Sequence, residues 1–407
     1  MSGPLGRDVH DGAAWRLLIG ALLANTVVVL PMILLGAVAV LVREELRFGE
    51  AALGVAAAMF ALSATLTSAP GGRLSERVGA ARTMTAGAVI SGAALVAIAL
   101  FASSWGLLVT LLAVAGIGNG LTQPATNGVL SGIINPARQG LAFGAKQAAI
   151  PLAGFLSGIA LPLIGLRVGW RWAFAAGGAL ALLVGLLVPR AGALINDRAD
   201  PPPADLDGED HAPLRPLLVI TVGAGLASMS ANAVGAFYVE SSVDAGVSAA
   251  AAGWWLAAGG AAGMVARTLW GWLADRRAGR HLVFVGWLMA VGALGLGVLA
   301  LRPAGGALLV LGTVLAYGAS WGWPGLFNYA IVRQSRAAPS AATGITQSGL
   351  FAGQLVGPPL FGWLVERASY ELAWAVFAAL LVVAAVLLRT GRARLLRARL
   401  PAGAAGR

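Results

Sequence analysis

The chain has 407 residues, of which 58% are hydrophobic and only 11% are charged. A typical soluble domain carries about 25% charged residues, and a soluble globule of this length cannot bury so much apolar surface. This composition excludes an ordinary soluble enzyme and a disordered chain, and it leaves a polytopic membrane protein. Because the chain has no cysteine, disulfides, thiolate metal sites and cysteine nucleophiles are excluded as well.

Apolar runs of about 20 residues, long enough to cross a bilayer as helices, recur along the chain. Six precede the polar stretch at 190–214 and six follow it. In chain order the predicted spans are 17–42, 50–71, 83–102, 105–130, 139–165 and 171–189, then 215–240, 248–273, 281–301, 305–331, 341–365 and 371–388. The predicted fold is an all-α membrane protein with twelve transmembrane helices, in pseudo-symmetric six-helix bundles at 17–189 and 215–388.

The distribution of basic residues predicts the orientation of the chain. With the N-terminal segment 1–16 placed inside, the loops and tail on that side hold twenty arginines, whereas the opposite loops hold six. Cytoplasmic loops are rich in Lys and Arg, so both termini are predicted in the cytoplasm and the protein in the inner (cytoplasmic) membrane. The net charge of +11 is explained in this way, and no nucleic-acid partner is expected.

The polar stretch 190–214 contains three successive prolines and a cluster of acids. Such a composition disfavours a helix, and we predict a cytoplasmic linker between the bundles, with a regulatory loop as the alternative. The segment 389–407 is predicted to be a basic cytoplasmic tail that fixes topology, and contact with anionic lipid is the alternative.

The two halves resemble each other when the sequence is shifted by about 200 residues. The string Gly72-Arg-Leu-Ser-Glu-Arg77 then aligns with Gly271-Trp-Leu-Ala-Asp-Arg276. Three further residues of the first half also find identical partners, which pair Pro124 with Pro324, Gly144 with Gly344 and Gln147 with Gln347. A repeat of six spans is typical of transporters built from two similar bundles around a central site.

The first of these strings resembles the loop signature of the major facilitator superfamily between its second and third helices. The second string resembles the same signature between the eighth and ninth helices. The resemblance covers roughly 15–390 and implies two bundles that rock about a midplane site, in a protein that works as a monomer. It also implies a cytoplasmic gate formed by Gly72, Glu76, Arg77, Gly271, Asp275 and Arg276. A carboxylate at a helix N-terminus and an arginine can hold two helices together; a plain charged turn is the alternative.

Lys146 is the one lysine among 28 basic side chains, and it lies inside a predicted span. A charged group at the centre of a membrane helix costs about 2.5–3.5 kcal/mol on insertion scales, so it needs a partner or a function. In an apolar setting a lysine can release its proton, whereas an arginine cannot. Lys146 is therefore predicted to bind an anionic substrate, to exchange a proton during transport, or both. The alternative is an amine that extends to the membrane surface.

Arg267 is the second basic residue inside a predicted span, four residues before Gly271. The string around it, Ala-Arg-Thr-Leu-Trp-Gly, resembles the eighth helix of monocarboxylate and oxalate transporters, and the chain shares features with cyanate-type anion transporters. In those families an arginine at this spacing faces the cavity and holds a carboxylate, which a guanidinium can grip with two N–H groups. A base that marks the end of the span is the alternative. The repeat places Thr346 opposite Lys146 and Ser68 opposite Arg267, so both cations break the symmetry.

Glu240 ends the seventh predicted span and is the one carboxylate close to the membrane interior. Together with Lys146 it is a candidate for carrying a coupling proton. The alternative for Glu240 is a solvated acid at a helix end.

Polar side chains also recur along single faces of several spans. Amides in hydrocarbon must find partners, so these faces are predicted to point inward. In the superfamily the first, fourth, seventh and tenth helices line the path. The predicted substrate-binding residues are Lys146, Arg267, Asn25, Asn119, Gln123, Asn127, Asn232, Trp321, Asn328 and Gln347. Hydrogen bonds between helices are the alternative role of each amide.

Two buried cations against one acid predict a secondary transporter that imports a small organic anion by alternating access with proton symport. The alternative is drug or metabolite efflux by proton antiport. The arginine of the fourth helix and the Gly-Pro signature of the fifth helix, which drug–proton antiporters carry, are both absent here. An enzyme is not expected, because the three histidines fall in loops or at span ends. No cofactor is expected, because the sequence has no phosphate-binding loop.

Overall fold

The computed structural model describes residues 5–133, 139–192, 214–276, 279–334 and 339–397, and every regular element within these ranges is helical. The first half contains α1 (Leu5–Leu46), α2 (Glu50–Val78), α3 (Ala80–Phe101), α4 (Trp105–Ile133), α5 (Gln139–Gln147), α6 (Ala149–Ala160), the wide turn η2 (Leu161–Gly165), α7 (Leu166–Val168) and α8 (Trp170–Gly192). The second half contains α9 (Leu214–Asp244), α10 (Ala249–Arg276), α11 (His281–Ala300), α12 (Gly306–Leu315), the wide turn η3 (Ala316–Ser320), α13 (Pro324–Gln334), α14 (Pro339–Arg367) and α15 (Tyr370–Arg397).

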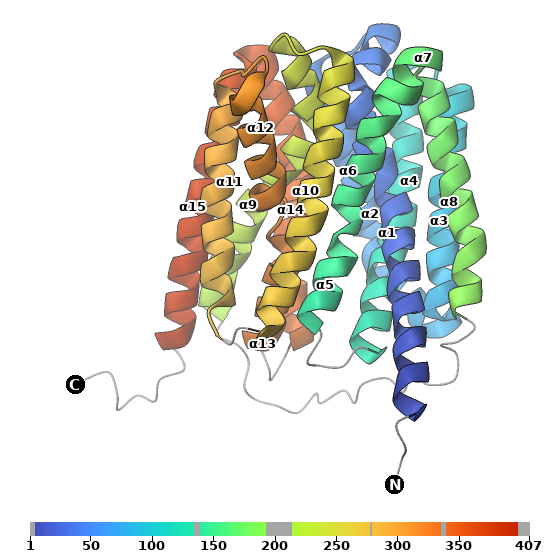
Figure 1. The fold of residues 1–407 in the computed structure, drawn as a ribbon, viewed down its shortest axis with the longest axis vertical. Coiled ribbons are helices and arrows are strands. Elements are labelled where there is room, and N and C mark those ends of the chain that lie inside the picture. The colour runs from blue at the N-terminus through green and yellow to red at the C-terminus, as the bar shows by residue number, and fades with distance from the viewer. Residues whose placement is uncertain (1–4, 134–138, 193–213, 277–278, 335–338, 398–407) are drawn as a thin grey trace.

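The helices form two bundles that stand side by side, α1–α8 in one and α9–α15 in the other (Figure 1). The beginning of α1 and the end of α15 lie at the same end of the molecule, which we call the termini side; the opposite end is the far side (Figure 1). The described part of the chain has eleven segments long and apolar enough to cross a membrane. The twelfth span is α14, whose 29 residues are long enough but include two prolines and several polar side chains. The predicted all-α fold with twelve spans is confirmed.

Several helix boundaries differ from the prediction, and α2, for example, continues past the predicted 71 to Val78. Helix α1 begins at Leu5, inside the predicted segment 1–16, and α15 continues to Arg397, well into the predicted tail 389–407. Arginine and leucine are good helix formers, and no proline interrupts α15, so this helix extends beyond its apolar run. Helix α8 ends at Gly192 and α9 begins at Leu214. The rest of the predicted linker, 193–213, lies outside the described residues.

Two of the spans are interrupted at midlength. In the fifth, α5 ends at Gln147 and α6 begins at Ala149, because Pro151 has no N–H to donate to the Gln147 carbonyl. In the tenth, the chain is not α-helical from Ala316 until α13 begins at Pro324. Proline is well tolerated at the first position of a helix, where no N–H is needed. These two breaks lie beside the site described below.

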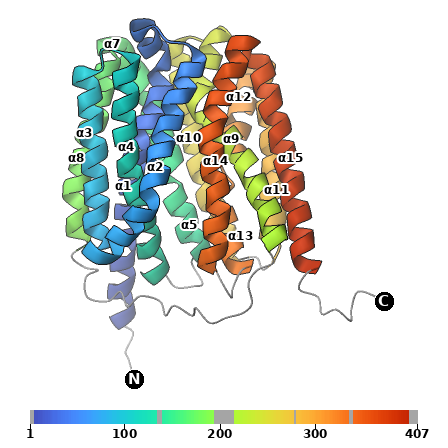
Figure 2. The same ribbon diagram turned by 180° about the vertical axis from the view of Figure 1, so that it is seen from behind.

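The bundles pack against each other through small residues on the far side. A Cβ atom added to Gly36 would lie 2.4 Å from the Gly235 carbonyl oxygen, and one added to Gly54 would lie 2.3 Å from that of Pro358. A Cβ on Gly158 of α6 would lie 2.4 Å from the backbone nitrogen of Ala257 in α10. Real Cβ atoms do not approach this closely, so these glycines allow direct backbone contact. Figure 2 shows α2 and α14 meeting towards the far side.

The termini side is closed along one seam and open along the other. On the α5–α10 seam, a Cβ on Gly271 would lie 2.3 Å from the Gly140 carbonyl oxygen, so these helices stay in contact to their ends. On the α2–α14 seam, a Cβ added to Gly71 or Gly72 would meet atoms of α4 in its own bundle, and one added to Gly344 would meet nothing within 4 Å. Ser68 of α2 and Gly344 of α14 line the central cavity, so the cavity reaches this part of the seam.

Candidate functional site

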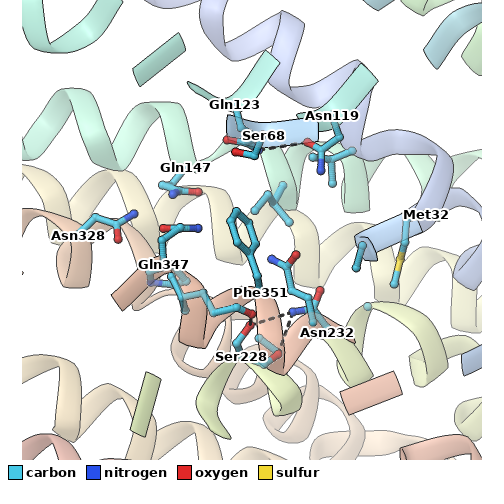
Figure 3. A pocket seen from close by; sticks show the side chains of 18 of the residues that line it. Met32, Ser68, Asn119, Gln123, Gln147, Ser228, Asn232, Asn328, Gln347 and Phe351 are labelled. Atoms are coloured by element: carbon cyan, nitrogen blue, oxygen red, sulfur yellow. Dashed lines mark hydrogen bonds between the residues drawn. The ribbon is translucent and has the colours of Figure 1, made fainter. Parts of the chain in front are cut away.

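A cavity of about 420 Å³ lies between the two bundles. It draws side chains from α1, α2, α4, α5, α6, α9, α10, the tenth span and α14. Apolar residues line its far-side part, among them Val29, Met32, Ile33 and Phe60. Towards the termini side the lining becomes polar, and solvent-exposed Asn127 of α4 lies there. Figure 3 shows amide side chains of both bundles around the ring of Phe351.

Lys146 lines this cavity and is only 3% exposed. Its Nζ donates to Gln123 Oε1 at 2.9 Å and to Asn127 Oδ1 at 2.7 Å, both on α4. The amine therefore does not extend to the membrane surface. Its two hydrogen-bond partners among the described residues are neutral amide oxygens, so its charge has hydrogen bonds but no counter-ion there. These bonds use two of the three N–H donors of the ammonium group.

Arg267 also lines the cavity and is 3% exposed. Its Nε donates to the carbonyl oxygen of Trp321 at 2.5 Å, and its Nη1 donates to the carbonyl oxygen of Gln147 at 2.5 Å. These are the carbonyls that the two helix breaks release. The guanidinium thus connects the interrupted fifth span of one bundle to the interrupted tenth span of the other. The sequence predicts that the guanidinium N–H groups bind a carboxylate, whereas in this structure Nε and Nη1 donate to backbone carbonyls.

The amides predicted to bind substrate surround the two cations. Asn119 Oδ1 accepts from Gln123 Nε2 at 3.4 Å, and Asn232 Nδ2 donates to the Ser228 carbonyl oxygen at 2.8 Å. The Trp321 indole lines the cavity, and its Nε1 donates to the carbonyl oxygen of Ala231 in α9. Of the ten predicted substrate-binding residues, nine line the cavity: Lys146, Arg267, Asn119, Gln123, Asn127, Asn232, Trp321, Asn328 and Gln347.

Asn25 is the exception. It is 1% exposed in α1 and does not line the cavity, and its Nδ2 donates to the Ala21 carbonyl oxygen at 2.7 Å. The helical face that reaches the cavity begins one turn later, at Val29. A polar residue on the right helix thus packs against protein instead of the cavity. We therefore leave Asn25 out of the binding site.

The cavity contains cationic but no anionic side chains. Among the residues that line it, Lys146 and Arg267 are charged, and none is Asp or Glu. The described residues supply neither cation with a salt bridge. Coulomb interactions are strong in a medium of low dielectric constant, so two positive charges without counter-ions attract an anion into this space.

Glu240 lies outside this cavity, near the far side. Its Oε2 accepts from Arg43 Nη1 at 3.0 Å, and its Oε1 is buried without a partner among the described residues. Arg43 of α1 also contacts Glu50 of α2 at 2.7 Å, so this arginine joins α9 to the first bundle. Another acid on the far side, Glu366 of α14, accepts from the backbone N–H of Ala51 at the start of α2 at 2.9 Å. Ion pairs and a helix cap therefore hold the far side closed.

Asp275 holds the termini side of the α5–α10 seam. Its Oδ1 accepts from the backbone N–H of Gly140 and its Oδ2 from that of Leu141, both at 2.7 Å. A carboxylate at a helix N-terminus satisfies N–H groups that have no partner within the helix and interacts favourably with the helix dipole. Because Asp275 lies in the last turn of α10 and Gly140 in the first turn of α5, this cap crosses from one bundle to the other.

The other predicted gate residues differ from one another in their surroundings. Gly271 is buried against Gly140, as its place in a close helix contact requires. The Arg276 guanidinium lies 3.9 Å from the centre of the Trp272 ring. Gly72, Glu76 and Arg77, the copy in the first bundle, lie at the open α2–α14 seam. Glu76 and Arg77 are exposed there and form no ion pair with another described residue.

Two functional features escape the sequence prediction. The Gln147 carbonyl is one, and a signal for it exists, because Pro151 four residues later removes its helical donor. The pairing of Arg43 with Glu240 is the other, and it joins residues 197 positions apart for which no local pattern exists.

Known proteins share this architecture. A family model described as Major Facilitator Superfamily matches residues 17–222 and 220–404. No curated protein sequence matches the chain. Solved structures do: a bacterial homologue of the human lysosomal transporter Spinster, inward-facing and occupied, superimposes with a TM-score of 0.70 at 17% sequence identity, covering 99% of this chain and 100% of that one.

A second similar structure is that of the proton:xylose symporter XylE of the major facilitator superfamily, bound to 6-bromo-6-deoxy-D-glucose. It has a TM-score of 0.72 at 17% identity, and the match covers 94% of this chain and 96% of that one. Identities this low show a shared fold and leave the substrate open.

Proposed function

The chain belongs to the major facilitator superfamily, and we propose that it carries a small organic anion across the cytoplasmic membrane by alternating access, in symport with protons. The observation that carries this proposal is the charge of the central cavity. Lys146 and Arg267 face it from the two bundles, and no carboxylate lines it. A cavity that served a cationic drug would need acids at these positions to offset the charge of its cargo.

The remaining lining supports an organic substrate. Amides of both bundles offer donors and acceptors around the cations, which suits a carboxylate that carries further polar atoms. The far-side part of the cavity is apolar, with Met32, Ile33 and Phe60, and the Phe351 ring lies among the amides (Figure 3). We therefore propose that the anionic group binds near Lys146 and Arg267, and that an apolar part of the substrate points to the far side.

We propose Lys146 as the group that takes up and releases the coupling proton. It is the one titratable base of the cavity lining besides Arg267, which stays charged. The neutral amides Gln123 and Asn127 hold the amine without fixing its charge. Glu240 is the second candidate, at the far-side ion pair with Arg43 instead of in the cavity. A proton on Glu240 would weaken that pair and favour opening of the far side.

With both termini in the cytoplasm, as the arginine distribution predicts, the open α2–α14 seam faces inward. In this assignment Asp275 is an engaged part of the cytoplasmic gate. Glu76 occupies the equivalent place in the first bundle. We propose that it caps the N-terminus of α14 when the α2–α14 seam closes, in the way that Asp275 caps α5.

Proton movement in liposomes tests the substrate class. Purified protein is reconstituted with a pH dye inside, and monocarboxylates, dicarboxylates, cyanate and cationic drugs are added in turn. We expect an anion to trigger a pH change in the wild type, and the change to be lost in Lys146→Ala while the protein still folds and inserts. Asn25→Ala is the matched control, because Asn25 lies outside the cavity.

A different result would identify the alternative. A pH change triggered by cationic drugs alone, and unaffected by Lys146→Ala, would contradict anion symport and support efflux by proton antiport.

A further inference from the structure

The two helix breaks and Arg267 form one unit at the centre of the molecule. The Gln147 carbonyl has no helical donor because Pro151 lacks an N–H, and the Trp321 carbonyl lies where the tenth span is not helical. Buried carbonyls almost always find a donor. Here both find the same one, since the Arg267 guanidinium donates to each at 2.5 Å.

The unit spans the interface between the bundles. Gln147 belongs to the first bundle, whereas Arg267 and Trp321 belong to the second. The backbones meet closely at this point, because a Cβ on Gly144 would lie 2.5 Å from the Arg267 carbonyl oxygen. The guanidinium bond to Gln147 is therefore a link between bundles near the middle of the α5–α10 seam, and the Asp275 cap is a second link at its end.

The same guanidinium faces the anion-attracting cavity. A carboxylate that binds with two prongs uses Nη2 together with either Nε or Nη1. Both Nε and Nη1 already donate to a carbonyl in this state. A two-pronged anion that takes Nε, or the Nη1 hydrogen now donated to Gln147, therefore competes with the backbone for that donor. Gln147 is the partner that belongs to the other bundle, and its side chain lines the cavity next to Lys146.

We propose that Arg267 is the positioning residue that couples substrate binding to movement of the bundles: the anion displaces the Gln147 carbonyl from Nη1 and releases the midpoint link of the α5–α10 seam. Only the second part of this inference, the displacement of the carbonyl by an anion, rests on the proposed anion substrate. The link itself exists without any substrate and can be tested alone.

The first experiment tests the link in the absence of substrate. The chain has no native cysteine, so spin labels can be placed at Val78 and Arg280, exposed positions of the two bundles on the termini side. Pro151→Ala supplies the missing N–H, which gives the Gln147 carbonyl a helical donor and weakens its bond to Arg267. Pro31→Ala is the matched control, because it supplies a helical N–H within α1 and not at the Gln147 carbonyl. We expect Pro151→Ala to broaden the distance distribution and Pro31→Ala to leave it unchanged.

The second experiment tests the competition. Benzoate, oxalate and acetate are titrated into the wild type and Pro151→Ala, with tetramethylammonium as the cationic control. If the anion must displace the carbonyl, the half-saturating concentration should fall by about tenfold in Pro151→Ala, which corresponds to about 1.4 kcal/mol. Arg267→Lys, which keeps the charge but cannot reach both carbonyls, should broaden the label distances without substrate and bind the anion more weakly.

Several outcomes would overturn the proposal. Label distances in Pro151→Ala and Arg267→Lys that match the wild type would refute the link. A broadened distribution with an unchanged half-saturating anion concentration would refute the competition. If tetramethylammonium alone shifted the distances, the proposed anion substrate would fail while the link stood. The thermal unfolding midpoint of each variant is measured as well, so that a variant that is simply less stable is recognised.

Discussion

Replacing Asp275 by Asn removes the charge of the cap that joins the two bundles on the termini side. In the wild type both carboxylate oxygens accept from backbone N–H groups of α5 at 2.7 Å. Asparagine retains one acceptor oxygen and turns an NH2 group towards the other N–H. Hydrogen bonds to charged groups contribute about 1.5–3 kcal/mol each, and a charge at a helix end contributes about 0.3–1 kcal/mol. The closed seam should lose about 2–3 kcal/mol.

A loss of this size changes the closed-to-open ratio of the seam by about 30- to 140-fold, since 1.4 kcal/mol is a factor of ten. Pulsed EPR distances between labels at Val78 and Arg280 should therefore lengthen in Asp275→Asn. Glu44→Gln is the control, because it removes one acid from an exposed position on the far side that has no ion pair in the described residues. A distribution identical to that of the wild type would show that the cap does not hold the seam.

Two further changes test the far side and the close helix contacts. Arg43→Gln should release Glu240 and Glu50 and lengthen the distance between labels at Val168 and Leu301, exposed far-side residues of the two bundles; an unaltered distance would contradict a latch at this ion pair. Gly158→Ala should lower the thermal midpoint, because the new methyl group would lie 2.4 Å from a backbone nitrogen of α10, whereas Gly106→Ala, which meets nothing within 4 Å, should leave the midpoint unchanged or raise it. Equal midpoints for both glycine variants would contradict the tight α6–α10 contact.

The architecture follows from the sequence because its signals are local or periodic. Apolar runs define the spans, and the repeated loop strings identify the two halves. Lys146 and Arg267 are also found from sequence, because a charge inside an apolar run needs a partner or a function. The structure places both in one cavity, although they lie far apart in the chain.

What the sequence does not predict depends on how the bundles meet. Asn25 and Asn232 are both single amides in apolar helices. In the structure Asn25 is buried against other protein groups, whereas Asn232 lines the cavity. The difference depends on helix rotation and depth, which periodicity alone leaves free. Arg267 is a similar case: its spacing suggests a carboxylate partner, whereas the structure gives it two backbone carbonyls that only the helix breaks make available.

Three departures from internal symmetry fall on the same seam. Pro151, Lys146 and Arg267 correspond in the repeat to Phe351, Thr346 and Ser68. Because Phe351 has an N–H, α14 continues without a break, and Thr346 satisfies its hydroxyl within that helix by donating to the Ala342 carbonyl oxygen at 3.1 Å.

The α5–α10 seam therefore has the broken helix, both cations and a cap engaged on the termini side. The described residues of the α2–α14 seam have neither the break nor the cations, and their cap, Glu366 on the N–H of Ala51, lies on the far side. A scaffold built from two equal halves would respond to a ligand equally at both seams. Because the charges and the released carbonyls lie on one seam, the proposed mechanism assigns substrate sensing to that seam and passage of the substrate to the other.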